Sequence, residues 1–367
     1  MNEAPGRLLR PEIAGLRAYE AESAAGLVKL DANENPYPPP PEVMERIASA
    51  AAGLALNRYP DPEAAGLRTL LAARSGWRPE GILLGNGSDE LIQLLLAACG
   101  GERATLLVPT PTFSMYRHIA LTMGWSVEEV PLTASFGLDE PALSSRAAAC
   151  RPRLTVFASP NNPTGNLFDH GVMERYLRKV DGIVVIDEAY HDFAGGSVVE
   201  LLPRHNNLVV LQTLSKIGLA ALRLGVLLAE PRLVREINKV RLPYNVGSFS
   251  QAAARAVLGA PDFLREQVRI LLAERARIAD ALARLPGVAA YPSDANFILF
   301  RTGRPSREVF EELRRQGVLV RDLGGEPGPL ERCLRVTVGT PAENDAFLGA
   351  MGGIFGAEQA ATLIKSE

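Results

Sequence analysis

One lysine lies where a free ammonium group would be poorly accommodated. Of the 39 basic residues only five are lysines, and four of these lie near charged neighbours or at the edge of an expected element. Lys216 lies instead in Leu-Ser-Lys-Ile-Gly-Leu-Ala-Ala-Leu, which offers the cation no local partner. Because an unpaired buried ammonium is costly, this amine should be neutral or covalently bonded, as Schiff-base chemistry requires. A lysine whose head reaches water is the less favoured alternative, since glycine and alanine surround it.

A second segment has the composition of an anion site. Gly85-Asn-Gly-Ser-Asp-Glu90 follows an expected strand and opens an expected helix. The free backbone N–H groups and the dipole at a helix start attract anions. Gly87 would let a phosphate approach closely, and Ser88 could add a hydroxyl. The alternative is an ordinary N-cap, and the segment matches neither a Walker loop nor a G-x-G-x-x-G fingerprint.

Two further polar segments also follow expected strands. In Ser159-Pro-Asn-Asn-Pro-Thr-Gly165, prolines and glycine give a rigid turn that would aim the Asn162 amide at a fixed point. Taken alone, an Asx-type turn is the more favoured interpretation. In Asp187-Glu-Ala-Tyr190, a carboxylate and a phenol share one loop at the end of a strand. For Asp187 taken alone, a helix cap is an equally good interpretation.

The elements that must position these groups can be read from the apolar pattern. Between residues 80 and 230, apolar stretches of strand length alternate with helix-like ones, including Asp89–Ala98 and Gly171–Lys179. Such alternation is typical of an α/β fold with a mainly parallel sheet covered on both faces. Ligands bind at the carboxyl ends of the strands, just where the polar segments lie. The expected strands are Gly81–Gly85, Ala104–Pro109, Trp125–Val130, Leu154–Ala158, Gly182–Ile186, Leu208–Gln212 and Leu224–Ala229.

The chain divides into an arm and two domains. Its 367 residues exceed one typical domain of roughly 100–200 residues. We expect a helical N-terminal arm over residues 1–30, a large domain over 31–255 and a small α+β domain over 256–367, which the arm completes. The large domain opens on a loop in which four consecutive prolines forbid a helix. Helices are expected at Glu42–Ala52, Pro62–Arg74, Gln251–Leu258 and Asp262–Leu285, and short strands at Ala295–Phe300, Val318–Val320 and Leu334–Val338.

Composition argues against several classes of function. A net charge of −3, with acids and bases mixed along the chain, gives no reason to expect nucleic acid or a membrane surface as partner. No uncharged apolar run approaches the roughly 20 residues of a membrane span, and no secretory signal is visible. The four histidines and three scattered cysteines show no metal-ligand spacing, so we expect no metal and a reduced, cytoplasmic protein.

Together these segments resemble the fold-type I aminotransferases, and most closely the histidinol-phosphate aminotransferase family. The resemblance runs nearly end to end and implies a seven-stranded, mainly parallel sheet in the large domain and a smaller α+β domain. The segments that carry it are Leu30-Asp-Ala-Asn-Glu-Asn-Pro36, Asn57-Arg-Tyr-Pro60, Gly87-Ser-Asp-Glu90, Pro111-Thr-Phe113, Ser159–Gly165, Asp187–Tyr190, Ser215-Lys216, Ala295-Asn-Phe297 and Cys333-Leu-Arg-Val-Thr-Val-Gly339.

The resemblance implies pyridoxal 5′-phosphate as cofactor. Lys216 would hold it as a Schiff base and move the substrate proton, while Asp187 would pair with the pyridine nitrogen and keep the ring electron-withdrawing. Asn162 and Tyr190 would contact the 3′ oxygen, and Phe113, where the family often has tyrosine, would stack on the ring. The phosphate would be held by Gly87, Ser88, Asp89, Ser215 and Arg223, and by Tyr59 of a neighbouring subunit. That last role implies a homodimer with shared active sites.

The resemblance also implies two substrates, histidinol phosphate and glutamate (or 2-oxoglutarate). Arg335 would hold the α-carboxylate of glutamate, and Arg321, helped by Tyr19 and Tyr244, the phosphate of histidinol phosphate. A solvated loop arginine beside Asp322 is the alternative for Arg321. The rival functions are a broad aromatic-amino-acid aminotransferase and a threonine-phosphate decarboxylase of the same fold. A non-catalytic regulator that binds the cofactor is disfavoured, because no basic helix-turn-helix precedes residue 30.

Overall fold

The computed structural model describes residues 9–16, 18, 23–325 and 327–364. Its large sheet has seven strands in the order β2-β8-β7-β6-β5-β3-β4, and β8 is antiparallel to both of its neighbours while the other pairs are parallel. The sequence-based prediction of a seven-stranded, mainly parallel sheet is thus confirmed. The strands are β2 (Ile82–Asn86), β3 (Thr105–Thr110), β4 (Ser126–Pro131), β5 (Leu154–Ala158), β6 (Ile183–Asp187), β7 (Leu208–Thr213) and β8 (Leu224–Ala229).

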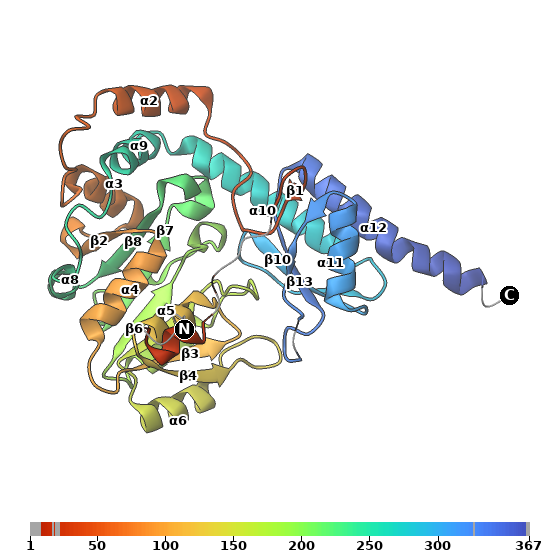
Figure 1. Cartoon of the computed structure of the whole chain (residues 1–367), viewed down its shortest axis with the longest axis horizontal. Coiled ribbons are helices and arrows are strands. Elements are labelled where there is room, and N and C mark those ends of the chain that lie inside the picture. Colours follow the sequence, from red (N-terminus) through yellow and green to blue (C-terminus); the bar gives the residue numbers. More distant parts are fainter. Residues whose placement is uncertain (1–8, 17, 19–22, 326, 365–367) are drawn as a thin grey trace, which may run out of the picture.

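Helices cover both faces of this sheet (Figure 1). Side chains of β6 and β7 alternate between two apolar clusters, so that Val184 and Val210 pack on one face and Val185 and Val209 on the other. Burial on both faces explains why these strands are apolar up to their carboxyl ends, where Asp187, Gln212 and Thr213 lie. One face carries α4 (Ser88–Cys99), α5 (Met115–Thr122) and α8 (Pro231–Asn238), and the other carries α3 (Ala65–Ser75), α6 (Glu140–Cys150), α7 (His170–Leu177) and α9 (Ser248–Leu258), with α2 (Pro41–Ala52) packed on α9.

A second, smaller sheet lies beside the first (Figure 1). Its four antiparallel strands have the order β12-β13-β10-β9. The elements of this part are β9 (Val288–Ala290), β10 (Phe297–Thr302), β11 (Val318–Leu319), β12 (Arg321–Asp322) and β13 (Cys333–Thr337), with the helices α10 (Asp262–Leu282), α11 (Ser306–Arg315) and α12 (Pro341–Ile364).

The N-terminal segment is less helical than the sequence suggested. Its described helix, α1, covers only Pro11–Ala14, and Val28–Lys29 form strand β1, which pairs in parallel with β11. The expectation of helix up to residue 30 is therefore wrong for residues 23–30. The backbone N–H groups of Val28 and Leu30 donate to carbonyls of the small domain at 2.8 Å, and this pairing holds the segment extended. Residues 28–30 are thus joined to the small domain, whereas α1 contacts α5 of the large one, and the arm as a part of the small domain stays a prediction.

Helix α10 joins the two apolar cores. Leu264, near its start, packs in the core of the large sheet, while Leu271 and Ile278 pack in the core of the small one. The domain limits drawn from sequence at residues 30 and 255 stay predictions. Among the described residues, no helix has the length and apolar character needed to cross a membrane.

Candidate active site

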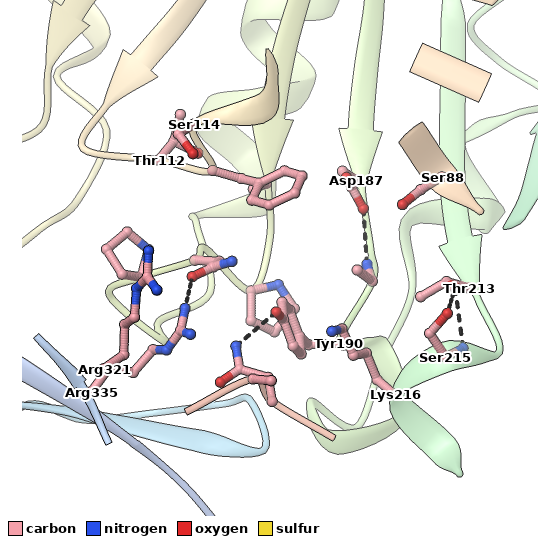
Figure 2. Close-up of a pocket in the computed structure, with 18 of the residues that line it drawn as sticks. Ser88, Thr112, Ser114, Asp187, Tyr190, Thr213, Ser215, Lys216, Arg321 and Arg335 are labelled. Atoms are coloured by element: carbon pink, nitrogen blue, oxygen red, sulfur yellow. Dashed lines mark hydrogen bonds between the residues drawn. The ribbon is translucent and has the colours of Figure 1, made fainter. Parts of the chain in front are cut away.

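The predicted polar segments meet in one cavity between the two domains. It has a volume of about 470 Å³ and is lined from the large sheet by residues at the ends of β5, β6 and β7 and from the small sheet by Arg321 and Arg335. Figure 2 shows Ser88 and Ser215 at one side, the two arginines at the other, and Tyr190 between them. The carboxyl ends of the strands therefore form the site, as the sequence indicates.

Asp187, the last residue of β6, is almost fully buried in this cavity. Its Oδ1 accepts a hydrogen bond from the backbone N–H of Ala189 at 3.0 Å, and its Oδ2 accepts one from the Tyr116 hydroxyl at 2.7 Å. Burial raises the pKa of Asp187 to about 6, while both hydrogen bonds act to lower it. A cation beside this carboxylate would replace the lost hydration, so the site favours a protonated nitrogen there.

Tyr116 was not identified from the sequence. It is fully buried in α5, and burial, then the nearby Asp187, raises the pKa of its phenol well above the ordinary range. Phe113 lies three residues before it, and the two rings make an edge contact with centroids 5.4 Å apart. The Pro-Thr-Phe motif was noted, but helix α5 was not predicted. Helical i, i+3 spacing would have indicated that Tyr116 lies near Phe113 and the cavity.

Lys216 follows β7 in a short 3₁₀ turn, Ser215–Ile217, which ends at Gly218 with φ of +104°. Its half-buried side chain lines the cavity, and Nζ lies 5.7 Å from the centroid of the Tyr190 ring. Within the described part of the chain, no residue forms a hydrogen bond or ion pair with this ammonium group. The amine is thus held at the cavity without a protein counter-ion.

The other end of the cavity can hold an anion. Gly87, with φ of +82°, precedes α4, and no side chain of the described residues caps this helix. Arg223 also lines the cavity, and its Nη2 lies 3.5 Å from Asp89 Oδ2. A Cβ at position 87 would come within 2.6 Å of Arg223 Nη2. The missing side chain therefore leaves room for the guanidinium beside the helix start.

Ser215 belongs to the same end of the cavity. Its hydroxyl accepts a hydrogen bond from Thr213 Oγ1 at 3.0 Å, and its backbone N–H donates to the same Thr213 oxygen at 3.1 Å. The same Thr213 hydroxyl also lies 3.0 Å from the backbone carbonyl oxygen of Leu224, so Thr213 fixes the position of Ser215 at the cavity. Phe113 lines the cavity as well.

The two predicted substrate arginines lie on adjacent strands. Arg321 in β12 is the register partner of Arg335 in β13, and both line the cavity. Arg335 is 8% exposed, donates to the backbone carbonyl of Asp31 at 2.8 Å and to Asn162 Oδ1, and lies over the Phe297 ring. Arg321 is thus a cavity residue in a strand, not a solvated loop residue.

Asn162 and Tyr190 are held by residues of distant segments. Asn162 accepts from Arg335, and the Tyr190 hydroxyl accepts from Asn33 Nδ2 at 2.9 Å. The role of Asn33 was missed, although it lies in the segment Leu30–Pro36 that carries part of the resemblance. No local signal marks which side chain of that segment turns toward Tyr190.

Two predicted residues lie away from the cavity of their own chain. Tyr59 is 80% exposed, and its ring stacks on that of Tyr244 with centroids 4.5 Å apart and an interplanar angle of 13°. Neither lines the cavity. The predicted contact of Tyr244 with substrate is therefore not made within one chain. Tyr19 lies outside the described residues. Among the residues that are described, no three His, Cys, Asp or Glu side chains come together in a group that could hold a metal ion.

Comparisons with known proteins agree with this geometry. The model of the family "Aminotransferase class I and II" matches residues 25–351. Histidinol-phosphate aminotransferase 2 of Nitrosococcus oceani is 45% identical over 346 residues, which cover 94% of this chain and 96% of that one. The Aquifex aeolicus histidinol-phosphate aminotransferase is 42% identical over 94% of this chain and 97% of its own length.

Among solved structures, the histidinol-phosphate aminotransferase of Sinorhizobium meliloti in complex with pyridoxal-5′-phosphate superposes with a TM-score of 0.86 at 25% identity, covering 95% of this chain and 98% of that one. The chain therefore belongs to the class I and II aminotransferase family, and within that family it groups with the histidinol-phosphate aminotransferases.

Proposed function

We propose that this aminotransferase transfers an amino group between L-histidinol phosphate and 2-oxoglutarate, the reaction that its relatives' names describe. One observation carries the choice of substrates. Arg321 and Arg335 lie side by side at the end of the cavity away from Ser88. Histidinol phosphate offers a phosphate ester and glutamate offers two carboxylates, and guanidinium groups bind both kinds of anion through paired hydrogen bonds.

Pyridoxal 5′-phosphate is the cofactor, and the cavity fits it at both ends. The uncapped start of α4 beside Gly87, with Ser215 and Arg223, supports a bound phosphate. Asp187 supports a protonated pyridine nitrogen, because its pKa of about 6 leaves it largely ionised at neutral pH even without a cationic partner. When bound, the cofactor supplies an electron-withdrawing ring that stabilises a carbanion on the substrate.

Each chain residue then has a defined task. Lys216 would bond to the cofactor and, once released by substrate, move the proton at the substrate carbon. Its lack of a protein counter-ion supports this, since a base must exist as a neutral amine. Asp187 would keep the pyridine nitrogen protonated. Asn162 and Tyr190 would donate to the 3′ oxygen, and Phe113 would cover one face of the ring.

The arginines would serve different anions. Arg335 is fixed by Asp31, Asn162 and the Phe297 ring, which supports a fork preorganised for the common α-carboxylate. Arg321 has no ion pair with a carboxylate among the described residues, which supports its use for the phosphate ester.

A screen of half-reactions tests the substrate. The visible absorbance of the bound cofactor is followed as it takes the amino group from histidinol phosphate, glutamate, phenylalanine or threonine phosphate. We expect histidinol phosphate and glutamate to react best. Losing one charge-assisted hydrogen bond costs roughly 1.5–3 kcal/mol, so Arg321→Ala should lower kcat/KM for histidinol phosphate by about ten- to a hundredfold. Arg307→Ala, which removes an arginine of α11 that pairs with Glu311, is the matched control and should leave it unchanged.

The same screen distinguishes the rival functions. A preference for phenylalanine that Arg321→Ala leaves unaltered would favour a broad aromatic aminotransferase. Release of carbon dioxide from threonine phosphate would favour a decarboxylase of the same fold.

We also propose that the active enzyme is a cytoplasmic homodimer with shared sites. Tyr59 is 80% exposed and stacks on Tyr244, and the nearby Leu56 and Leu242 are also exposed, at 87% and 73%. An exposed apolar surface of this kind is typical of an interface. Tyr59, and with it Tyr244, would reach the partner's cavity.

Mixing inactive Lys216→Ala and Tyr59→Ala subunits tests the sharing, because one site of each hybrid keeps both residues. Activity should return on exchange. A verified hybrid without activity would refute a role for Tyr59 across the interface.

A further inference from the structure

Asn33, which was not among the predicted site residues, has hydrogen bonds to its backbone N–H, its backbone carbonyl and its side chain. It is 1% exposed and has φ of +55°, a left-handed conformation that asparagine and aspartate tolerate better than most residues. Its backbone N–H donates to Thr337 Oγ1 at 2.9 Å, and its carbonyl accepts from Asn296 Nδ2 at 3.1 Å. Thr337 ends β13, and Asn296 immediately precedes β10. The small sheet therefore fixes the backbone of Asn33.

The hydroxyl of Thr337 determines which way the Asn33 amide points. Because this hydroxyl accepts from the Asn33 N–H, its single proton is left to donate, and it donates to Asn33 Oδ1 at 3.2 Å. The oxygen side of the amide is thus turned toward Thr337. The Nδ2 side is left facing Tyr190, whose hydroxyl lies 2.9 Å away.

This orientation also fixes the hydrogen bonding of Tyr190. An amide NH₂ group can only donate, so the phenolic oxygen must accept from Asn33, and its own proton must point elsewhere. Within the described residues, no protein group accepts that proton. Tyr190 lines the cavity, which is the remaining direction. The Tyr190 hydroxyl is therefore prepared to donate to a ligand oxygen.

We infer that Asn33 is a positioning residue, which directs the proton of the Tyr190 hydroxyl into the cavity, toward the 3′ oxygen of the bound cofactor. The inference rests on the proposed contact between Tyr190 and that oxygen. In this inference, hydrogen bonds run from Thr337 of the small domain to Asn33 and from Asn33 to Tyr190. The small domain would thereby influence the charge on the cofactor's 3′ oxygen. Substrate specificity does not enter it.

Asn33→Asp reverses the hydrogen bond with little change in shape. A carboxylate accepts where the amide donated, so it would take the Tyr190 proton away from the cavity, and it tolerates the left-handed φ. The readout is the visible absorbance of the bound cofactor as a function of pH, measured on the holoenzyme. A hydrogen bond to the 3′ oxygen draws negative charge from it and weakens its hold on the neighbouring proton. Losing that bond should raise the midpoint of this titration, the pH at which half of the absorbance change has occurred, by about one pH unit.

Three further variants separate this effect from the added charge. Tyr190→Phe should raise the midpoint by a similar amount. Adding Asn33→Asp to Tyr190→Phe should then shift it by less than half of what Asn33→Asp does alone, because the two changes act through one contact. Asn35→Asp adds the same charge to the same loop at a residue that donates to Gln267 at 3.0 Å, and it should leave the midpoint near that of the wild type.

The outcomes are distinct. If Asn33→Asp shifts the midpoint equally in the wild type and in Tyr190→Phe, or does not shift it at all, the inference is overturned and the proposed function is left intact. An unchanged midpoint in Tyr190→Phe would overturn both the proposed Tyr190 contact and the inference. If Asn33→Asp does not fold, Thr337→Val serves instead. It frees the amide to turn its oxygen to Tyr190 and should raise the midpoint by a smaller amount, whereas no change would contradict the inference.

Discussion

Asp187 should make the cofactor-free protein less stable as the pH rises. Burial raises the pKa of this carboxyl to about 6 from an ordinary value of 3.8. In the unfolded chain the carboxyl is hydrated and returns to its ordinary pKa. A carboxyl whose pKa is higher in the folded state contributes stability that is fully present below about 3.8 and is lost as the pH rises through about 6.

The size of the effect follows from the two values. The difference of about two pH units between 3.8 and 6 corresponds to ~3 kcal/mol, since one unit is worth ~1.4 kcal/mol. Roughly half of this, ~1.5 kcal/mol, is lost between about pH 5 and about pH 7.5. At about 2 cal/mol/K per residue, unfolding all 367 residues has an entropy near ~0.8 kcal/mol/K. The expected decrease in Tm is therefore about 2 °C.

Thermal melts of the cofactor-free wild type and of Asp187→Asn provide the assay. Asparagine has nearly the same shape and does not titrate, so the difference in Tm between the two proteins isolates this carboxyl from every other group. The wild type should lose about 2 °C relative to the variant from about pH 5 to about pH 7.5. A constant difference, or a relative gain by the wild type, would refute the assignment of a destabilised buried carboxylate.

Three further results are expected. Borohydride reduction of the holoenzyme should fix the cofactor to Lys216, and an adduct mapped to any other lysine would contradict the assignment. Tyr116→Phe removes the 2.7 Å hydrogen bond to Asp187 and should lower kcat about tenfold with little change in KM, whereas a raised KM alone would indicate a substrate-binding role. Gly87→Ala places a methyl 2.6 Å from Arg223 Nη2 at a φ of +82°. Titration with the cofactor should therefore show its affinity weakened at least about tenfold. An unchanged affinity would refute the proposed phosphate site at Gly87 and Arg223.

The large sheet could be predicted because its strands are buried on both faces. Leu154–Ala158 and Leu224–Ala229 were located to the residue, since strands between two layers of helices are built almost entirely of apolar residues. The direction of β8 could not be predicted, because an antiparallel strand buried on both faces has the same composition as a parallel one. Helix α5 was missed for another reason. Its eight residues, which include Arg117 and His118, are too few to show a clear periodicity.

The candidate site was predicted as a set of residues but not as a set of pairs. Lys216, Asp187 and Asn162 each follow a strand, and strand ends converge, so their presence in one cavity could be expected from sequence. Their partners could not. The pairing of Tyr116 with Asp187 joins residues 71 apart, and nothing in either local sequence specifies the other. Tyr59 and Tyr244 were both assigned to binding, but their mutual stacking was not anticipated.

Other contacts that the sequence could not predict cross between the two sheets. Arg335 of the small sheet donates to Asn162 of the large one, and Asn33, fixed by the small sheet, donates to Tyr190. Both receiving groups are those proposed to contact the cofactor's 3′ oxygen. A rotation of the small domain would therefore change two hydrogen bonds to that pair of residues together. If Arg335 binds the substrate carboxylate and Asn162 the cofactor oxygen, as proposed, an anion that moves Arg335 would also change its hydrogen bond to Asn162, and the two sites would be coupled through that single amide.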